Sequence, residues 1–274
     1  MEIVRAILHI VEHDFRNFFR YKWWLFGLIS MNLADLFIMA LVYNKMVNPN
    51  IIAQVRSYFS FFAPGVTVIG LFASAYMIGR EINMEVRRQI HHYMLSLPIT
   101  RLELAVGRLL SGGLRGMVYM SPLLLTTFIF LGLPSLPQLL VILGALFLLA
   151  TGISGLSITT AVSTRSLEKF VTARGLVYYL LFFCSSIFYP MSLIQELGRE
   201  GIMPQPLVVL AEFNPLSSGA DLIRSFLIGT PAFTFNMIRN LVVFSTIFTT
   251  VAMFAYVKIL ERVDEGIKLF RKRK

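Results

Sequence analysis

Six apolar windows separated by more polar stretches dominate the pattern along this chain. Each window is about 20 residues long, the length that an α-helix needs to cross a hydrocarbon core of about 30 Å. We therefore predict a single transmembrane domain over residues 1–274, an all-α integral membrane protein with six transmembrane helices. The predicted spans are 24–43, 58–78, 109–131, 139–162, 171–193 and 237–257.

The segment before the first span, residues 1–22, has the pattern of an amphipathic helix. Apolar residues recur along it at steps of three and four, and charged residues occupy the other angles. Trp23 and Trp24 follow at the position of an aromatic belt. Because this segment continues directly into a span, we interpret it as an interfacial helix; a helix packed on a soluble partner is the alternative.

Three polar residues interrupt the spans: Asn32 and Asp35 in the first and Arg115 in the third. Ionisable groups at membrane depth normally face a protein interior or a water-filled path. For Asp35, structural pairing and pathway lining both stay open. Arg115 lies near one end of its span, so we expect its side chain to snorkel to the headgroups.

Composition supports a membrane protein and excludes some other classes. The chain is 56% hydrophobic and 15% charged, whereas a soluble domain has about 25% charged residues. A net charge of +10 is compatible with nucleic-acid binding. The basic residues flank the spans instead of forming one face, however, so we predict no nucleic-acid partner. The single cysteine, Cys184, rules out a disulfide framework within one chain.

The distribution of Lys and Arg predicts the orientation. Nineteen of the 25 lie in the N-terminal segment, the loops 79–108 and 163–174, and the basic tail 258–274, and five lie in the opposite set of segments. By the positive-inside rule both termini are cytoplasmic, in a multi-pass protein of the plasma membrane. The segment 194–236 is then external or re-entrant, and within it residues 216–228 predict a short helix that cannot cross the bilayer.

Two short strings resemble motifs of catalytic proteins, and a third such motif is absent. His9, Glu12 and His13 match the H-x-x-E-H pattern of zinc peptidases, but the chain has no large soluble domain to supply a third ligand. Gly152, Ser154 and Gly155 resemble the G-x-S-G of rhomboid proteases, but all four histidines lie outside the predicted spans. No glycine precedes a lysine, so the chain has no phosphate-binding P-loop. We predict that the chain is not an enzyme and binds no metal or cofactor.

The order of these features resembles the ABC-2 type transporter permeases. The most telling stretches are Gly79-Arg80-Glu81, then Leu95-Ser96-Leu97-Pro98-Ile99-Thr100-Arg101, then Gly107-Arg108 at the entry to the third span. A second likeness is Asn214-Pro215-Leu216, followed by Arg224, before the last span. The resemblance covers nearly the whole chain.

The resemblance implies a permease subunit of an ATP-driven exporter for an amphipathic or lipid-like substrate. ATP and Mg²⁺ would bind to two separate P-loop ATPase subunits and not to this chain. A second permease chain, identical or related, would complete the membrane part. A coupling helix near 80–97 would dock on the ATPase. The residues assigned to that interface are Glu81, Glu85, Arg87, Arg88, Ile90, Leu95, Leu97, Pro98 and Arg101.

The same resemblance places a translocation path and an external gate. Aromatic residues of the second and fifth spans, together with Asp35, would line the path: Phe61, Phe62, Tyr76, Tyr178, Tyr179 and Phe182. The external gate would consist of Asn214, Pro215, Leu216 and Arg224. The rival interpretations are a membrane channel or assembly protein without ATP coupling, and an intramembrane protease.

Overall fold

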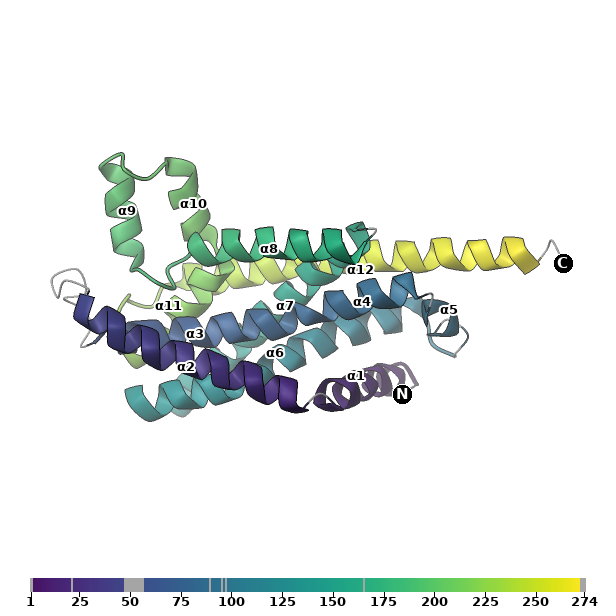
Figure 1. Ribbon diagram of the computed structural model, residues 1–274, viewed down its shortest axis with the longest axis horizontal. Coiled ribbons are helices and arrows are strands. Elements are labelled where there is room, and N and C mark those ends of the chain that lie inside the picture. Colours follow the sequence, from purple (N-terminus) through teal and green to yellow (C-terminus); the bar gives the residue numbers. More distant parts are fainter. Residues whose placement is uncertain are drawn as a thin grey trace.

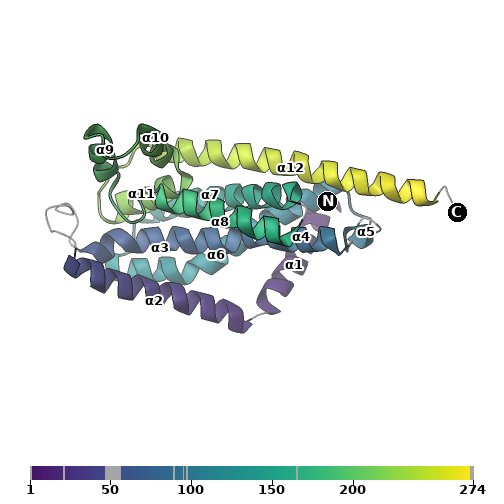
Figure 2. The same ribbon diagram turned by 45° about the horizontal axis from the view of Figure 1, so that its top comes forward.

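The computed structural model describes residues 2–20, 22–46, 57–88, 90–94, 96, 98–164 and 166–271, and over these ranges every regular element is a helix (Figure 1). Long helices run side by side and form an elongated bundle (Figures 1 and 2). They are α2 (Lys22–Met46), α3 (Tyr58–Ala75) with its continuation α4 (Met77–Arg87), α6 (Arg101–Leu131), α7 (Leu136–Ser163), α8 (Leu167–Phe183) and α12 (Phe235–Arg271).

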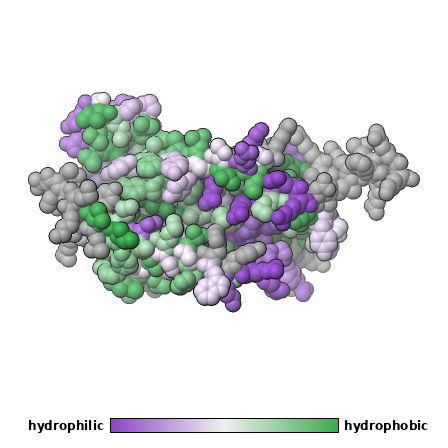
Figure 3. Space-filling model, viewed as in Figure 1, coloured by the Kyte–Doolittle hydropathy of each residue, from purple (hydrophilic) through white to green (hydrophobic). Residues whose placement is uncertain are grey.

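The first and the last helix reach the same end of this bundle. Helix α1 (Glu2–Arg20) lies there beside α6, and α12 extends past the other helices in the same direction (Figures 1 and 2). We call this the terminal end and the opposite one the distal end. Hydrophilic residues gather on the surface toward the terminal end, and the middle of the bundle is hydrophobic (Figure 3).

Among the described residues, four stretches are long and apolar enough to cross a membrane: Tyr58–Arg87, Arg101–Leu131, Leu136–Ser163 and Phe235–Glu261. Helix α2 contains a shorter apolar stretch, Leu25–Met39, and α8 has 17 residues. The prediction of an all-α membrane protein is confirmed, whereas the count of six crossings stays a prediction.

Two helices end at other residues than the predicted spans. The second span does not end at residue 78, because Tyr76 keeps helical dihedral angles and α4 continues from α3 toward the terminal end. Ile78, Gly79, Ile82 and Asn83 are buried there, so the first part of the predicted 79–108 loop belongs to the bundle. The fifth span ends at Phe183 rather than 193, since irregular backbone follows from Cys184 to Pro190.

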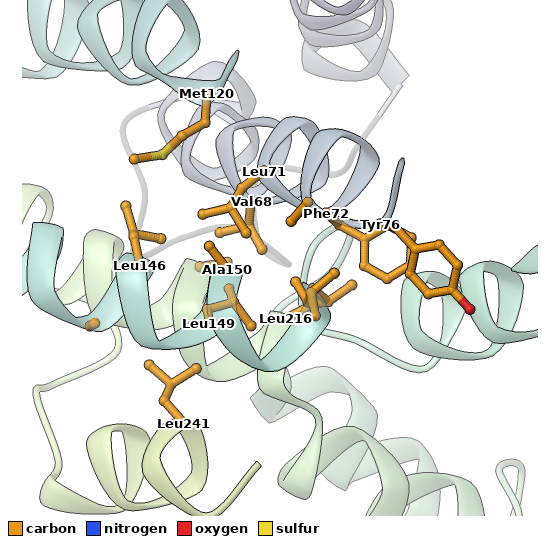
Figure 4. Close-up of a cluster of buried hydrophobic side chains, with 14 of the residues drawn as sticks. Val68, Leu71, Phe72, Tyr76, Met120, Leu146, Leu149, Ala150, Leu216 and Leu241 are labelled. Atoms are coloured by element: carbon orange, nitrogen blue, oxygen red, sulfur yellow. The ribbon is translucent and has the colours of Figure 1, made fainter. Parts of the chain in front are cut away.

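The core forms where α7 packs against α3, α6 and α12. Val68 and Leu71 of α3 meet Leu146 and Leu149 of α7 in one cluster, which Leu216 of the short helix α11 (Pro215–Leu227) joins (Figure 4). Small residues bring the helix backbones close together. The backbone N–H of Gly79 donates a hydrogen bond to Ser157 Oγ over 3.2 Å. In lipid, such close approach and interhelical hydrogen bonds replace the hydrophobic effect as the force that joins helices.

The predicted segment 194–236 contains more structure than one short helix. Two helices that the sequence did not predict, α9 (Met191–Arg199) and α10 (Gln205–Phe213), form a hairpin that stands across the long axis of the bundle at the distal end (Figure 1). The predicted helix is confirmed as α11, but it packs inside the bundle, and Pro215 to Arg224 are all buried.

Replacing Gly79 with alanine tests the contact between α4 and α7. A Cβ atom at this position would collide with the backbone carbonyl of Ser157, so the helices must separate. We expect Gly79→Ala to lower the free energy of unfolding by about 1–3 kcal/mol, the usual cost of overpacking. Gly144→Ala on α7 is the control, because nothing lies within 4 Å of its added methyl group. Thermal unfolding in detergent should separate the two variants; equal midpoints would contradict the packing.

Candidate functional site

The terminal end contains a buried group of charged side chains, Asp14, Glu81, Glu85, Arg108 and Arg115, which we call the terminal charge cluster. Arg108 Nη1 donates to Asp14 Oδ1 over 2.6 Å, and Arg108 Nη2 donates to Glu85 Oε1 over 2.6 Å. Arg115 Nη1 donates to Glu81 Oε1, also over 2.6 Å, and its Nη2 donates to the backbone carbonyl of Asp14. These bonds join α1, α4 and α6.

Because these ion pairs are buried, losing one partner would leave an uncompensated charge inside the protein. The side chains of Asp14, Arg108 and Arg115 are at most 1% exposed, whereas Glu85 and Glu81 retain some exposure. Arg115 also lies over the ring of Phe18, 5.4 Å from its centroid. The prediction that Arg115 snorkels to the headgroups is wrong. Helices α4 and α1 provide hydrogen-bond acceptors for its guanidinium inside the protein.

The charge state of α1 follows from these neighbours. Burial alone would raise the pKa of Asp14. The positive charges of Arg108 and Arg115 and the hydrogen bonds with His13 and Ser111 outweigh burial, so the pKa of Asp14 is lowered. Asp14 is therefore ionised at neutral pH. The hydrogen bond with Asp14 raises the pKa of His13 above its usual value, although partial burial opposes this shift. The imidazole lies 3.5 Å from Asp14 Oδ1 at the accessible edge of the cluster.

Helix α1 has three faces. Asp14 and Phe18 point toward α6 and are buried, and Arg5, Glu12 and Arg16 lie on an exposed polar face. Between the two faces runs an exposed apolar stripe that includes Val4, Leu8 and Phe19. An apolar stripe beside a charged face is the arrangement of a helix that lies in a membrane interface, as the sequence predicts.

Next to the cluster, the chain leaves the bundle through residues 88–100. Helix α4 ends at Arg87, and the short helix α5 (Ile90–Met94) follows. Helix α6 begins after a capping box, in which Glu103 accepts from the backbone N–H of Thr100 over 2.6 Å and Thr100 Oγ1 accepts from the N–H of Glu103 over 3.2 Å. The loop is thus anchored at its end by two reciprocal hydrogen bonds.

The structure divides the residues assigned to ATPase docking into two groups. Arg87, Arg88, Ile90 and Pro98 are exposed on the loop. Glu81 and Glu85 form ion pairs with Arg115 and Arg108, and the Glu81 side chain keeps 38% exposure, so their place in the ATPase interface stays a prediction.

Three further residues were assigned to ATPase docking: Arg101, Leu95 and Leu97. Arg101 lies 3.6 Å from Glu261 of α12. Leu95 and Leu97 lie outside the described residues.

At the distal end, Arg224 forms a second buried centre with Asp221, Ser186 and Phe61, which we call the distal arginine cluster. Its guanidinium donates to Asp221 Oδ1 over 2.6 Å and to the backbone carbonyls of Phe61, Ser186 and Ile187 over 2.9, 2.7 and 3.0 Å. It also lies 3.7 Å from the centroid of the Phe61 ring. One side chain of α11 thus joins the start of α3 to the irregular backbone after α8.

Asn214 completes this connection and explains the start of α11. Its side-chain oxygen accepts from the N–H of Leu216 as an N-cap, and its amide donates to the carbonyls of Leu181 and Cys184. The residues assigned to an external gate, Asn214, Pro215, Leu216 and Arg224, therefore lie together, and all four are buried.

The residues assigned to a translocation path do not share one surface. Phe61, Phe62 and Tyr76 are core residues with at most 4% exposure, so they line no open path in this conformation. Aromatic residues of this region contribute to packing, because tilted ring pairs such as Phe72 with Tyr178 and Tyr76 with Phe170 connect α3 with α8. Tyr178 packs on Phe72 at 5.6 Å between centroids and on Phe182 at 4.9 Å.

The outward face of α8 and the first span hold the accessible members of that set. Tyr179 is 61% exposed, and Asp35 of α2 is also exposed.

The described residues provide no support for the two hydrolase motifs. No group of three or more His, Cys, Asp or Glu among them could hold a metal ion. Ser154 Oγ donates to the carbonyl of Leu109 over 3.0 Å inside the core, so its hydroxyl joins α7 to α6.

A family model for the ABC-2 type transporter matches residues 5–228. The chain belongs to the ABC-2 type transporter family. No individual curated protein matches it. As an ABC-2 permease it is the membrane component of an ABC transporter and not itself a catalyst, in a family whose members work with an ATPase partner. The match includes both clusters and the loop between α4 and α6.

Sequence reasoning missed Asp14 and Arg108 in this ABC-2 permease. Asp14 was one of several polar residues on an amphipathic helix, and Arg108 was counted as a residue flanking a span. A usable signal was present: Glu81 and Glu85 are four residues apart, and Arg108 and Arg115 are seven apart. Each spacing places both residues of the pair on one helix face. The sequence therefore indicated that an acidic face of one helix could pack against a basic face of the other.

Replacing Arg108 with methionine tests whether the ion pairs hold α1 and α4. The variant leaves Asp14 and Glu85 buried without their cation, so we expect the free energy of unfolding to fall by about 3–5 kcal/mol. Arg101→Met, at a more exposed pair, should change it by less than about 1 kcal/mol. Both are measured by denaturant unfolding in detergent micelles.

A triple variant separates lost charge pairing from lost packing. Arg108→Met combined with Asp14→Asn and Glu85→Gln removes the uncompensated carboxylates, so it should be more stable than Arg108→Met alone. If the triple variant is equally unstable or worse, charge is not what Arg108 contributes.

Proposed function

We propose that this permease is driven by a separate P-loop ATPase that docks on residues 88–100 at the terminal end. The observation that supports this most is the connection of the loop to the bundle. On one side it continues into α4, whose Glu81 and Glu85 bind the arginines of α6. On the other side it enters α6 through the capping box at Thr100. A force on the loop therefore reaches α1, α4 and α6 together.

The exposed loop residues fit a protein interface. Arg87 and Arg88 are exposed, and Ile90 adds an accessible apolar side chain. Arginine next to an apolar centre is a common composition of protein contacts. The terminal end would face the cytoplasm of a plasma-membrane protein, with both chain ends on that side, in agreement with the positive-inside rule.

The working complex would contain two permease chains, identical or related, and two ATPase subunits that bind ATP and Mg²⁺. When the ATPases close on ATP, the two docking loops would move together, and each bundle would switch between inward-open and outward-open arrangements. At the distal end the buried Arg224 and Asn214 would keep the outer gate of α11 attached to α3 and α8.

The outward face of α8 supports an amphipathic or lipid-like substrate that is exported. Leu176, Tyr179, Leu180 and Phe183 are exposed along it, which makes the half of α8 nearer the distal end apolar and aromatic. Asp35 on α2 adds an exposed acidic side chain elsewhere on the bundle. A ligand with an apolar body and a polar or cationic group would match this combination better than a sugar or an inorganic ion.

Charge and polarity changes on the loop test the docking. The ATPase is first identified as the P-loop protein that co-purifies with the parent chain. We expect Arg88→Glu combined with Ile90→Asp to reduce its recovery at least tenfold and to abolish the change in ATPase rate on assembly. The control is Arg199→Glu on α9, an exposed arginine at the distal end.

Two outcomes would overturn this proposal. Equal recovery of the ATPase by the parent and the double variant would remove the docking assignment. Failure of the parent chain to bind any P-loop ATPase would remove ATP coupling itself.

A further inference from the structure

Helix α4 carries opposite charges on two of its sides. Glu81 and Glu85 face α6 and bind its arginines. Arg80 lies on another side, one turn after Tyr76, because residues four apart share a helix face. The ring of Tyr76 packs on Phe170 of α8 at 6.1 Å between centroids, and the first turns of α8 lie beside α4 (Figures 1 and 2). The basic side of α4 therefore faces α8.

Arg174 lies on the side of α8 that faces the bundle. Phe170, one turn before it, is 1% exposed, and Tyr178, one turn after it, packs on an aromatic ring of α3. The side chain of Arg174 is partly buried between them, and the charge of Arg80 acts on it. We call Arg80 and Arg174, together with Tyr76, the basic seam. It lies opposite to the outward face of α8 that we assign to the substrate.

The two arginines of the basic seam have no counter-ion in the part of the chain that the structure describes. No hydrogen bond or ion pair joins either guanidinium to a described carboxylate. Glu168, the acidic residue closest to Arg174 in the sequence, lies on the exposed side of α8. By contrast, the buried arginines of the terminal charge cluster and the distal arginine cluster each bind a carboxylate. The positive charge of the basic seam is therefore not neutralised by the described residues.

A hydrogen bond to α7 gives the depth of the basic seam. Tyr76 OH donates to Thr160 Oγ1 over 2.9 Å, and Thr160 lies three residues before the end of the candidate span Leu136–Ser163. At 1.5 Å per residue this is about 5 Å from the end of the apolar stretch. Arg80 lies one turn farther toward the terminal end, where hydrophilic residues gather (Figure 3). The basic seam therefore opens at the level of the lipid headgroups.

The position of Arg174 adds a reason for an anion at this place. Its backbone lies one turn deeper in the bundle than that of Phe170, and an unpaired guanidinium at membrane depth is costly. The long side chain of an arginine can extend back toward the headgroups, where an anionic group is within reach. An anion there would lie between the cations of two helices that face each other.

We propose that the basic seam binds the phosphate group of an anionic phospholipid from the leaflet at the terminal end. A phosphate accepts two parallel N–H bonds from one guanidinium, so it can satisfy Arg80 and Arg174 together. Basic pockets between membrane helices are typical sites for anionic headgroups. A zwitterionic lipid carries its own cation and would compensate the two arginines less well. The bound headgroup would join α4 to α8, and the inference does not depend on the ATPase.

Native mass spectrometry of the full chain in detergent tests this site. The parent is titrated with phosphatidylglycerol or with phosphatidylcholine of the same acyl chains, and the Kd of the first bound lipid is measured. The test variants are Arg80→Gln alone and Arg80→Gln combined with Arg174→Gln. The control, Arg16→Gln combined with Arg199→Gln, removes the same charge from two exposed arginines outside the basic seam.

We expect the parent to bind phosphatidylglycerol at least fivefold more tightly than phosphatidylcholine. Arg80→Gln should weaken the binding of phosphatidylglycerol at least threefold and the double variant at least tenfold, whereas the control should change it less than twofold. Because Arg80 is exposed, its replacement does not disturb the core, and the result does not depend on how well the double variant folds.

Three results would overturn the proposal. If the double variant binds phosphatidylglycerol as tightly as the parent, the lipid does not bind at the basic seam. If the control loses as much affinity as the double variant, the lipid responds to net charge and not to this site. If millimolar inorganic phosphate displaces phosphatidylglycerol from the parent, the basic seam takes a soluble anion and the assignment to lipid is wrong.

Discussion

Two arginines inside an apolar bundle require partners, and this requirement organises the terminal end of the permease. Arg108 and Arg115 lie on α6 with their guanidinium groups closed off from solvent. Leaving such charges unpaired would cost several kcal/mol each, so the helices that supply the carboxylates must stay in contact. Asp14 brings α1 and Glu85 brings α4 to the same cation. An interfacial helix, a membrane span and the start of a loop are thereby held as one unit.

The distal end follows the same logic with different partners. Arg224 satisfies one carboxylate and three backbone carbonyls, and these carbonyls belong to segments that end or begin a helix. Between the terminal charge cluster and the distal arginine cluster, the contacts are mainly apolar. Hydroxyl groups add hydrogen bonds there, between Thr67 and Thr127 and between Thr151 and Ser245. Buried ion pairs and hydrogen bonds thus hold the two ends of the bundle, whereas close packing of apolar side chains holds its middle.

Much of the architecture was predictable, because length and hydropathy report directly on membrane crossing. The interfacial helix, the main spans and the short helix of residues 216–228 follow from periodicity and from Pro215. The second span was predicted to end at residue 78, before Glu81 and Glu85. Their partners Arg115 and Arg108 lie 34 and 23 residues later in the chain, and pairing across such a separation is a property of tertiary structure. For the same reason, Phe61 and Tyr76 were taken for an accessible lining although both are buried.

The way α8 is attached has a consequence for how the bundle can move in lipid. Among its described residues only Phe170 is fully enclosed, and its aromatic side chains meet α3 through ring contacts such as Tyr178 with Phe72. Acyl chains can replace apolar contacts of this kind with little change in free energy, whereas they cannot replace the ion pairs of Arg108. Apart from its last turn, where Asn214 binds the carbonyls of Leu181 and Cys184, α8 is therefore held to the bundle by contacts that lipid can replace. A passage opened along α8 would lead into the bilayer itself, so that cargo could leave without ever crossing an aqueous pore.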